Sequence, residues 1–388
     1  MSNKTYERKQ KENKPVVAIC YDFDKTLSPD DMQAQGYIQS LGYDIKDFWT
    51  RSNLLAVDNE MDQNLAYMYT MKEEARGNIV FTKKKLKEYG EQVKLFSGVE
   101  EWFGRINKYG EEQGVIVEHY IISSGLKEMI EGTSIADKFE KIYACSFIYN
   151  DKGEAIWPAQ VVNYTNKTQF LFRIEKGTLD VNDPAVNDFF EPDEIRVPFR
   201  NMIYIGDSDT DVPCMKLVNL HNGHSIGVYN PASQNKNKVY KMMKDKRIKY
   251  FVPADYTENS DLDILVKTII DRTVQNEKLE EIYYKNNKET MDYFNKENPE
   301  EMKKEYLIYS LKNSRSFAET HSVISKLIEC EKWTKEQQEQ LCTIAMKNQQ
   351  VRWIILDEDV KLFYEHLIKN YSGNSQDIQE VTKLISEI

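Results

Sequence analysis

The sequence predicts an α/β fold, a doubly wound, Rossmann-like parallel sheet core with an inserted helical cap and an all-α C-terminal module. Short apolar runs alternate with helical periodicity over most of the chain, which is typical of parallel crossover units. About ninety residues separate the first two predicted strands, far more than one crossover helix needs. Fifteen of the sixteen glycines and nine of the ten prolines precede residue 276. A chain of 388 residues also exceeds one compact core, so we expect several domains.

The core elements follow from their composition. A helix is expected where Trp102, Phe103 and Ile106 share one side. A hairpin is expected over 142–162, because Asn150-Asp151-Lys152-Gly153 has turn chemistry between two alternating segments. The apolar runs that predict the other strands are 16–21, 119–122, 201–205, 225–229 and 250–252.

These elements imply boundaries along the chain. We expect a disordered tail over 1–15, which carries five bases and two acids without an apolar stretch. The core then comprises 16–30 and 94–275, with a helical cap over 31–93. The acidic segment 175–196 reads as a solvated loop.

Composition excludes several classes of function. With 63 acids against 52 bases, a net charge of -11 and no long Lys/Arg block, the overall charge does not suggest a surface that binds nucleic acid. No run of about 18 apolar residues is present, so we expect no membrane segment. Five scattered cysteines without metal-ligand spacing favour a reducing compartment. A cytoplasmic protein is the expectation.

Acidic residues follow two of the predicted strands directly. Asp22 and Asp24 come after the first strand, and Gly206-Asp207-Ser208-Asp209-Thr210-Asp211 follows another. Ligands of open α/β sheets bind at the carboxyl ends of strands, so these acids should gather at one edge. Clustered carboxylates repel unless a cation lies between them, and an all-oxygen set suits Mg²⁺. Asp209 lies between Asp207 and Asp211, and we expect its side chain to face solvent.

Two further signals suit a phosphate group. Ser123-Ser124-Gly125 ends the second strand, and Lys167 begins a helical segment. A hydroxyl and an ammonium are suitable donors to phosphate oxygens.

Taken in order, D-x-D-x-T at 22–26, Ser123, Lys167 and G-D-x-x-x-D at 206–211 resemble the four motifs of the haloacid dehalogenase (HAD) superfamily. The resemblance covers roughly residues 16–272. A helical cap between the first two motifs resembles the C1 type, and the pattern is most similar to phosphoserine-phosphatase-like members. The connection between Lys167 and Asp207 is longer than those small enzymes usually show.

The resemblance implies a role for each motif residue. Asp22 would attack phosphorus and form an aspartyl-phosphate, while Asp24 would act as general acid and then general base. Ser123 would bind the phosphoryl group and Lys167 would neutralise its charge. Thr26 would support the turn and line the substrate site.

It also implies the metal and substrate sites. Mg²⁺ would be held by Asp22, the backbone carbonyl of Asp24, and Asp207, with Asp211 supporting or acting through water. Ser124 and Gly125 would line the substrate site. Asp31 would read a substrate amine, although a helix N-cap or first-turn acid is equally compatible with its position.

The sequence therefore predicts a Mg²⁺-dependent phosphatase of a small phosphorylated metabolite, with Asp24 favouring ester hydrolysis within the superfamily. A phosphotransferase or mutase is the chemical alternative. A regulatory protein that recruits a partner through residues 276–388 is the alternative of a different class. Two capping boxes (Ser316 with Glu319, Thr334 with Gln337) and three apolar stripes predict a helical bundle there, suited to core packing, a homodimer or a protein partner.

Overall fold

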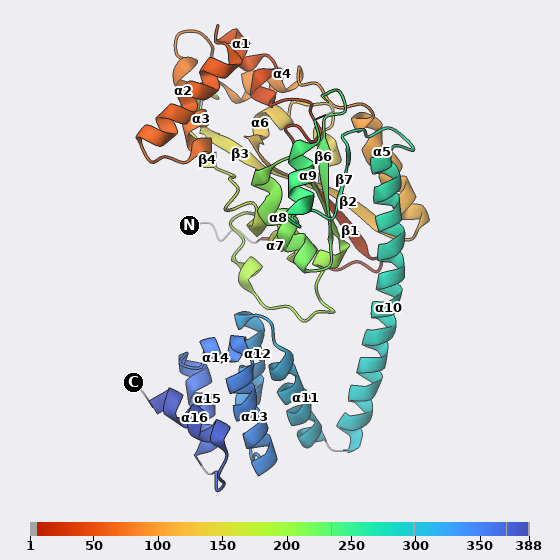
Figure 1. Ribbon diagram of the computed structural model, residues 1–388, viewed down its shortest axis with the longest axis vertical. Helices are drawn as coiled ribbons and strands as arrows, with labels where there is room; N and C mark the ends of the chain where they lie inside the picture. Colours follow the sequence, from red (N-terminus) through yellow and green to blue (C-terminus); the bar gives the residue numbers. More distant parts are fainter. Residues whose placement is uncertain (1–5, 234, 298, 370, 387–388) are drawn as a thin grey trace. The chain divides into compact units, whose positions relative to one another are not determined.

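The computed structural model describes residues 6–386 apart from 234, 298 and 370 (Figure 1). They form two compact units. The first runs to Val186 and includes Glu194–Lys278, and the second comprises Asn187–Asp193 and the residues from Leu279 onward. Each unit has its own hydrophobic core.

A seven-stranded sheet forms the centre of the first unit, in the order β4-β3-β2-β1-β5-β6-β7. All neighbouring strands pair in parallel except the antiparallel hairpin of β3 and β4. This arrangement confirms the predicted α/β fold class. The strands are β1 (Val16–Tyr21), β2 (Ile116–Leu126), β3 (Lys141–Tyr149), β4 (Ala155–Gln160), β5 (Met202–Gly206), β6 (His224–Tyr229) and β7 (Tyr250–Pro253).

Strand β1 lies between β2 and β5, and all six of its residues are buried. Such a continuous apolar run is expected of a parallel strand that is covered on both faces. The register pairs Tyr21 with both Ile121 and Ile205. The residues that follow these three positions therefore meet at one edge, which brings the ends of three motif-bearing strands together.

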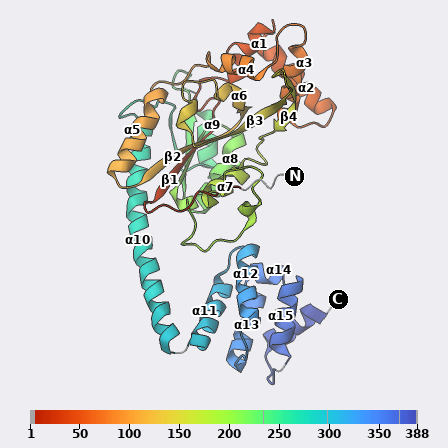
Figure 2. The same ribbon diagram turned by 180° about the vertical axis from the view of Figure 1, so that it is seen from behind.

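Helices cover both faces of the sheet, as the two opposite views show (Figures 1 and 2). Successive side chains of a strand point to opposite faces. Tyr21 accepts a hydrogen bond from Trp102 at 2.8 Å on one face, whereas Cys20 lies near Cys214 on the other. The helices around the sheet include α5 (Val99–Glu112), α6 (Lys127–Ile130), α7 (Thr168–Lys176), α8 (Val212–Leu220) and α9 (Asn237–Lys244).

The expected cap is helical. Side chains of Asp44, Asp62 and Thr82 accept backbone N–H bonds in the first turns of three of its helices. Backbone bonds from Ala155 to the carbonyl of Phe81 and from Lys83 to that of Gly153 join the cap to the β3–β4 hairpin. The cap helices are α1 (Tyr37–Ser40), α2 (Ile45–Asp58), α3 (Gln63–Glu74) and α4 (Lys83–Gly90).

The expectation of a disordered tail over 1–15 is wrong for residues 6–15, and residues 1–5 lie outside the described part of the chain. Lys9 donates its backbone N–H to Gly177 and its ammonium to Glu118 and Glu140. Arg196, whose side chain is fully buried, pairs with Glu12 and Glu118. Ion pairs with residues far along the chain hold this polar segment, and local composition does not reveal them.

The second unit resumes at Leu279, close to the expected boundary at residue 276, but contains more helices than the three apolar stripes indicated. Helix α10 (Asp261–Glu297) runs without a break across residue 276, and six further helices follow where three apolar stripes were recognised. Ser316 and Thr334 both cap their helices. Thr334 forms the predicted capping box with Gln337, whereas Glu319 accepts the N–H of Arg315 instead of that of Ser316. Within this unit, Glu191 of the acidic segment pairs with Lys326 at 2.8 Å. The following helices are α11 (Pro299–Asn313), α12 (Phe317–Ile328), α13 (Lys335–Lys347), α14 (Gln349–Trp353), α15 (Glu358–Ile368) and α16 (Gln376–Ser386).

In the part of the chain that the structure describes, no helix has the length and apolarity needed to cross a membrane.

Candidate active site

The loop after β1 turns sharply and presents two carboxylates. The backbone N–H groups of Thr26, Leu27 and Ser28 all donate to the carbonyl of Phe23, at 2.9 to 3.2 Å. Asp22 continues the pairing of β1, because its N–H donates to Ile205 at 3.0 Å. The turn thus separates Asp22, at the strand end, from Asp24, in the loop.

Lys167 lies between two acids that follow different strands. Its ammonium is 2.7 Å from Asp211 Oδ1 and 3.2 Å from Asp22 Oδ1, and its side chain is fully buried. Burial alone would lower the pKa of Lys167, but the charges of Asp211 and Asp22 outweigh this effect and raise it. Lys167 is therefore a permanent cation at the strand edge.

Asp211 is held by more donors than Lys167 alone. Tyr204, two residues before Gly206 in β5, donates its hydroxyl to Asp211 Oδ1 at 2.9 Å. The backbone N–H and hydroxyl of Ser208 donate to Oδ2, each at 3.2 Å. A Cβ at Gly206 would lie 2.6 Å from Asp211 Oδ2, so glycine is required for this close approach. With both oxygens occupied, Asp211 is better suited to hold Lys167 than to bind a metal directly.

The two acids of the first motif have different surroundings. Burial raises the pKa of Asp22 to about 7, and the charge of Asp211 adds to this effect while Lys167 opposes it. The pKa of Asp24 is raised well above its usual range, by burial first and then by the charges of Asp31 and Asp22. Asp24 Oδ1 accepts the backbone N–H of Met32 at 2.8 Å. Asp24 is thus the stronger candidate for a proton donor.

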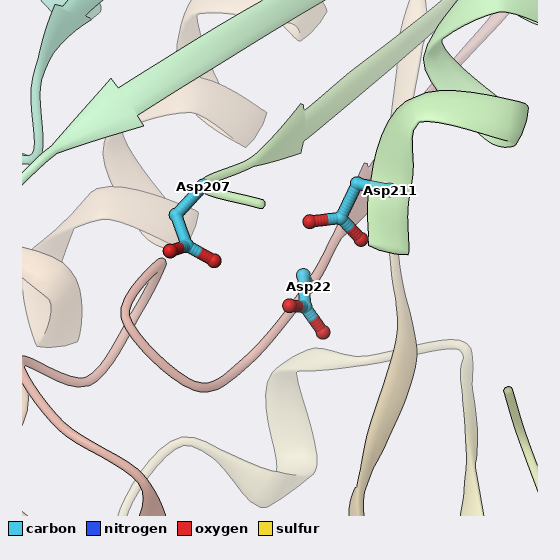
Figure 3. A group of neighbouring side chains, drawn as sticks. All are labelled: Asp22, Asp207 and Asp211. Carbon is cyan, nitrogen blue, oxygen red and sulfur yellow. The ribbon is translucent and has the colours of Figure 1, made fainter. Parts of the chain in front are cut away.

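Three carboxylates could hold a metal ion. Asp22, Asp207 and Asp211 each offer one oxygen, and these oxygens lie within 4.8 Å of one another. Figure 3 shows the three side chains around a common space at the strand ends. An all-oxygen donor set of this kind fits Mg²⁺, which binds through one or two carboxylates and completes its shell with water and phosphate. Because Asp211 is already held by other donors, Asp22 and Asp207 are the better direct ligands.

Asp207 has a second neighbour that the motif did not indicate. Lys238 of α9 donates to Asp207 Oδ2 at 3.1 Å. Burial raises the pKa of Asp207, and Lys238 lowers it in part. Asp209 is exposed to solvent, as expected.

Ser123, Ser124 and Gly125 lie beside this cluster at the end of β2. The buried Ser123 accepts the N–H of Gly125 at 3.0 Å through its hydroxyl oxygen, which leaves the hydroxyl proton for a ligand. The carbonyl of Ser124 accepts the hydroxyl of Tyr67 from the cap at 2.7 Å. A Cβ at Gly125 would lie 2.3 Å from Met32 Cε and 3.0 Å from Asp24 Oδ2, so the absence of a side chain there makes room for both side chains.

Thr26 is fully buried in the loop after β1. Its carbonyl accepts a hydrogen bond from the hydroxyl of Tyr256 at 2.9 Å, which holds the turn in place. Its own hydroxyl oxygen is buried and has no hydrogen-bond partner among the described residues.

Asp31 makes an ion pair that the sequence did not suggest. Both of its carboxylate oxygens lie 2.8 Å from the ammonium of Lys25. Within the described turn that follows, Asp31 makes no side-chain capping bond, so the N-cap interpretation is not supported. Its carboxylate therefore already has a cationic partner within the chain.

Four residues near the motifs were missed from sequence. The alternation of β5 could have indicated Tyr204, which points to the same face as Gly206. Lys25 lies inside the first motif, but its partner depends on how the loop folds. Lys238 and Tyr67 carry no local signal, because helices far from the motifs supply them.

Comparisons with known proteins add the following. No family model matches the chain. An uncharacterized protein of Borreliella burgdorferi is 27% identical over 284 residues, which span 65% of this chain and 95% of that protein. A HAD family hydrolase from Salmonella enterica serovar Typhi is similar in structure with a TM-score of 0.43 and 16% identity, covering 67% of this chain and 73% of its own. A probable phosphoserine phosphatase from Vibrio cholerae has a TM-score of 0.44 and 12% identity, with 68% and 67% covered.

Proposed function

We propose that this chain is a Mg²⁺-dependent phosphomonoester hydrolase that works through an aspartyl-phosphate on Asp22. The observation that carries the proposal is the buried ammonium of Lys167, which is shared by Asp22 and Asp211. A second carboxyl with a raised pKa, Asp24, follows in the same loop. Two acids whose environments differ in this way suit a nucleophile and a proton donor.

In the first half-reaction, a carboxylate oxygen of Asp22 attacks phosphorus and the bond from phosphorus to the ester oxygen breaks. The protonated carboxyl of Asp24 gives its proton to the leaving oxygen, so the alcohol departs neutral. Lys167 and the hydroxyl of Ser123 stabilise negative charge on the phosphoryl oxygens.

In the second half-reaction, Asp24 has become a carboxylate and takes a proton from an attacking water. That water bonds to phosphorus, the acyl-phosphate bond breaks, and inorganic phosphate and the Asp22 carboxylate are released. Asp24 is then protonated again, as the cycle requires.

Asp22, Asp207 and the backbone carbonyl of Asp24 would hold Mg²⁺. When bound, the ion supplies positive charge that favours the ionised nucleophile and neutralises the phosphoryl oxygens. Tyr67 and the hairpin contacts hold the cap over this edge of the sheet. A cap attached beside the strand ends favours a small phosphorylated metabolite as the substrate.

The direct test is to identify the covalent intermediate. Purified protein with Mg²⁺ is incubated with p-nitrophenyl phosphate and a panel of phosphorylated metabolites, and phosphate release is measured. Borohydride treatment during turnover reduces an acyl-phosphate, so peptide mass spectrometry should find homoserine at position 22. The Asp24→Asn variant should accumulate the intermediate, because hydrolysis of the acyl-phosphate then lacks its base.

The Asp22→Asn variant is the matched control, since it keeps size and shape but removes the nucleophile. It should release no phosphate and yield no homoserine. Full activity of Asp22→Asn, or an intermediate mapped to another residue, would overturn the proposal.

A further inference from the structure

Lys25 and Asp31 form a closed pair beside the proton-donating acid of the site. The ammonium is 2.8 Å from both carboxylate oxygens, so one cation satisfies both of them. Lys25 has a φ of 59°, a left-handed conformation that lysine adopts only at a cost. The backbone is therefore strained at Lys25, the residue whose ammonium pairs with Asp31.

The pair lies near the position of the leaving group. Met32, which follows Asp31, donates its backbone N–H to Asp24 Oδ1 at 2.8 Å. Asp24 is the proposed acid for the ester oxygen, so the substituent on that oxygen departs toward this turn. The side chains of Lys25 and Asp31 are 46% and 29% exposed, which leaves both open to a ligand.

An ammonium on the substrate would meet an occupied carboxylate. It would have to displace Lys25 or share Asp31 with it, which brings two cations together. Repulsion against the wrong charge is an effective source of specificity. An acceptor oxygen on the substrate meets the opposite situation, because Lys25 retains a donor after it pairs with Asp31.

Basic residues of the cap do not change the charge that a substrate meets at Lys25 and Asp31. Arg51 is paired with Glu74 at 2.8 Å, and Arg76 with Glu73 at 2.8 Å, all four on cap helices or their ends. These cations are bound within the cap, whereas Lys25 lies in the catalytic loop itself.

We infer that Lys25 determines substrate specificity: it fills the place of a substrate ammonium at Asp31, and it selects phosphomonoesters that carry a hydroxyl or carboxylate oxygen beside the phosphate. The inference rests on the proposed function for the identity of the leaving-group side. It replaces the expectation that Asp31 reads a substrate amine.

Two esters that differ in one group provide the test. O-phosphoserine and 3-phosphoglycerate differ only in an ammonium against a hydroxyl. Wild-type kcat/KM should favour 3-phosphoglycerate, and Lys25→Met should shift the ratio toward O-phosphoserine by about tenfold or more, the size of one charge-assisted hydrogen bond. In the Lys25→Met, Asp31→Asn double variant this gain should disappear, because no carboxylate remains to bind the amine.

Lys138→Met is the matched control, since Lys138 pairs with Asp137 at 2.9 Å outside the site and should leave the ratio unchanged. Lys25→Gln is the second variant should Lys25→Met fail to fold. A wild-type preference for O-phosphoserine that Asp31→Asn abolishes would overturn the inference.

Binding separates this inference from the proposed function. Dissociation constants of both esters are measured by calorimetry in the Asp22→Asn background, with and without Lys25→Met. If the wild-type protein releases no phosphate but the ratio of the two dissociation constants shifts with Lys25→Met as stated, the inference stands and the hydrolase proposal falls. Binding of neither ester, or a ratio insensitive to Lys25, would contradict the inference.

Discussion

Lys167 and Asp211 meet at 2.7 Å although they are 44 residues apart, and both side chains are fully buried. Neither charge would be stable in this environment alone, because an unpaired ion carries a desolvation cost of several kcal/mol. The pair joins the start of α7 to the strand edge of β5, and Asp22 shares the same ammonium.

Replacing Lys167 by Met should impair both activity and stability. The change leaves Asp22 and Asp211 without their cation, so we expect kcat to fall by about 10²- to 10³-fold. Breaking a buried pair also costs about 3–5 kcal/mol of the free energy of unfolding. Phosphate release and urea unfolding measure the two effects. Lys108→Met, at an exposed lysine, is the control and should change neither.

Tyr204→Phe tests whether the hydroxyl on Asp211 positions that carboxylate. We expect a loss of about 1 kcal/mol in stability, typical of one hydrogen bond, together with a lower kcat. Tyr143→Phe removes the hydroxyl of another buried tyrosine, which donates to the Leu179 carbonyl at 3.0 Å, and should affect stability alone. Equal kcat values for the two variants would show that Tyr204 has only a structural role.

Metal binding should depend on Asp207 and not on its neighbour Asp209. At Mg²⁺ concentrations about 100 times its Kd, wild-type protein should gain about 2.7 kcal/mol of stability, visible as a rise in Tm. EDTA should reverse this rise and stop phosphate release. Asp207→Asn should show neither response, whereas Asp209→Asn should behave like wild type because Asp209 faces solvent. An unchanged Mg²⁺ response in Asp207→Asn would contradict the assigned site.

The ion pairs of Glu118 should make the fold sensitive to acid. Burial by itself raises the pKa of Glu118, but hydrogen bonds from Arg196, Lys9 and Tyr120 outweigh it and lower the pKa from 4.5 to about 2. A depressed pKa means that the folded state holds fewer protons than the unfolded state in this range. The stabilisation is complete above about pH 4.5 and is lost as the pH falls toward 2.

Glu118→Gln should therefore weaken the dependence of stability on pH below 4.5 and destabilise the protein at neutral pH, where Arg196 loses a buried partner. Denaturant titrations at several pH values measure both effects. Glu140→Gln is the control, since Glu140 is more exposed and pairs with Lys9. An acid profile of Glu118→Gln that matches wild type would disprove the assignment.

The second unit should be dispensable for catalysis. The two units have separate cores, and the motif residues all belong to the first. A chain that ends at Lys278 keeps the ion pair of Arg200 with Glu277, so it should fold and retain phosphatase activity close to that of the full chain. Phosphate release and sedimentation of both chains would check this. A full-length dimer with a monomeric shortened chain would assign self-association to the second unit, and loss of activity would contradict the prediction.

The sequence by itself determined the features that depend on near neighbours. The apolar run 16–21 forms the buried strand β1 with those bounds, and Thr334 with Gln337 forms the predicted capping box. Strand periodicity and capping are settled within a few residues, so the strands along the chain and the polar residues that follow them could be predicted directly. Because parallel strands end at a common edge, the acids of the first and last motifs could also be expected to meet.

Only the tertiary structure decided which side chains act as partners. The pairing of Asp31 with Lys25, the hydroxyl of Tyr204 on Asp211, and the attachment of residues 6–15 through Lys9 and Glu12 were not predicted. The same holds for α10, which passes residue 276 without a break. An ion pair or buried hydrogen bond depends on distances between groups that the fold brings together, and local pattern contains no information about those distances.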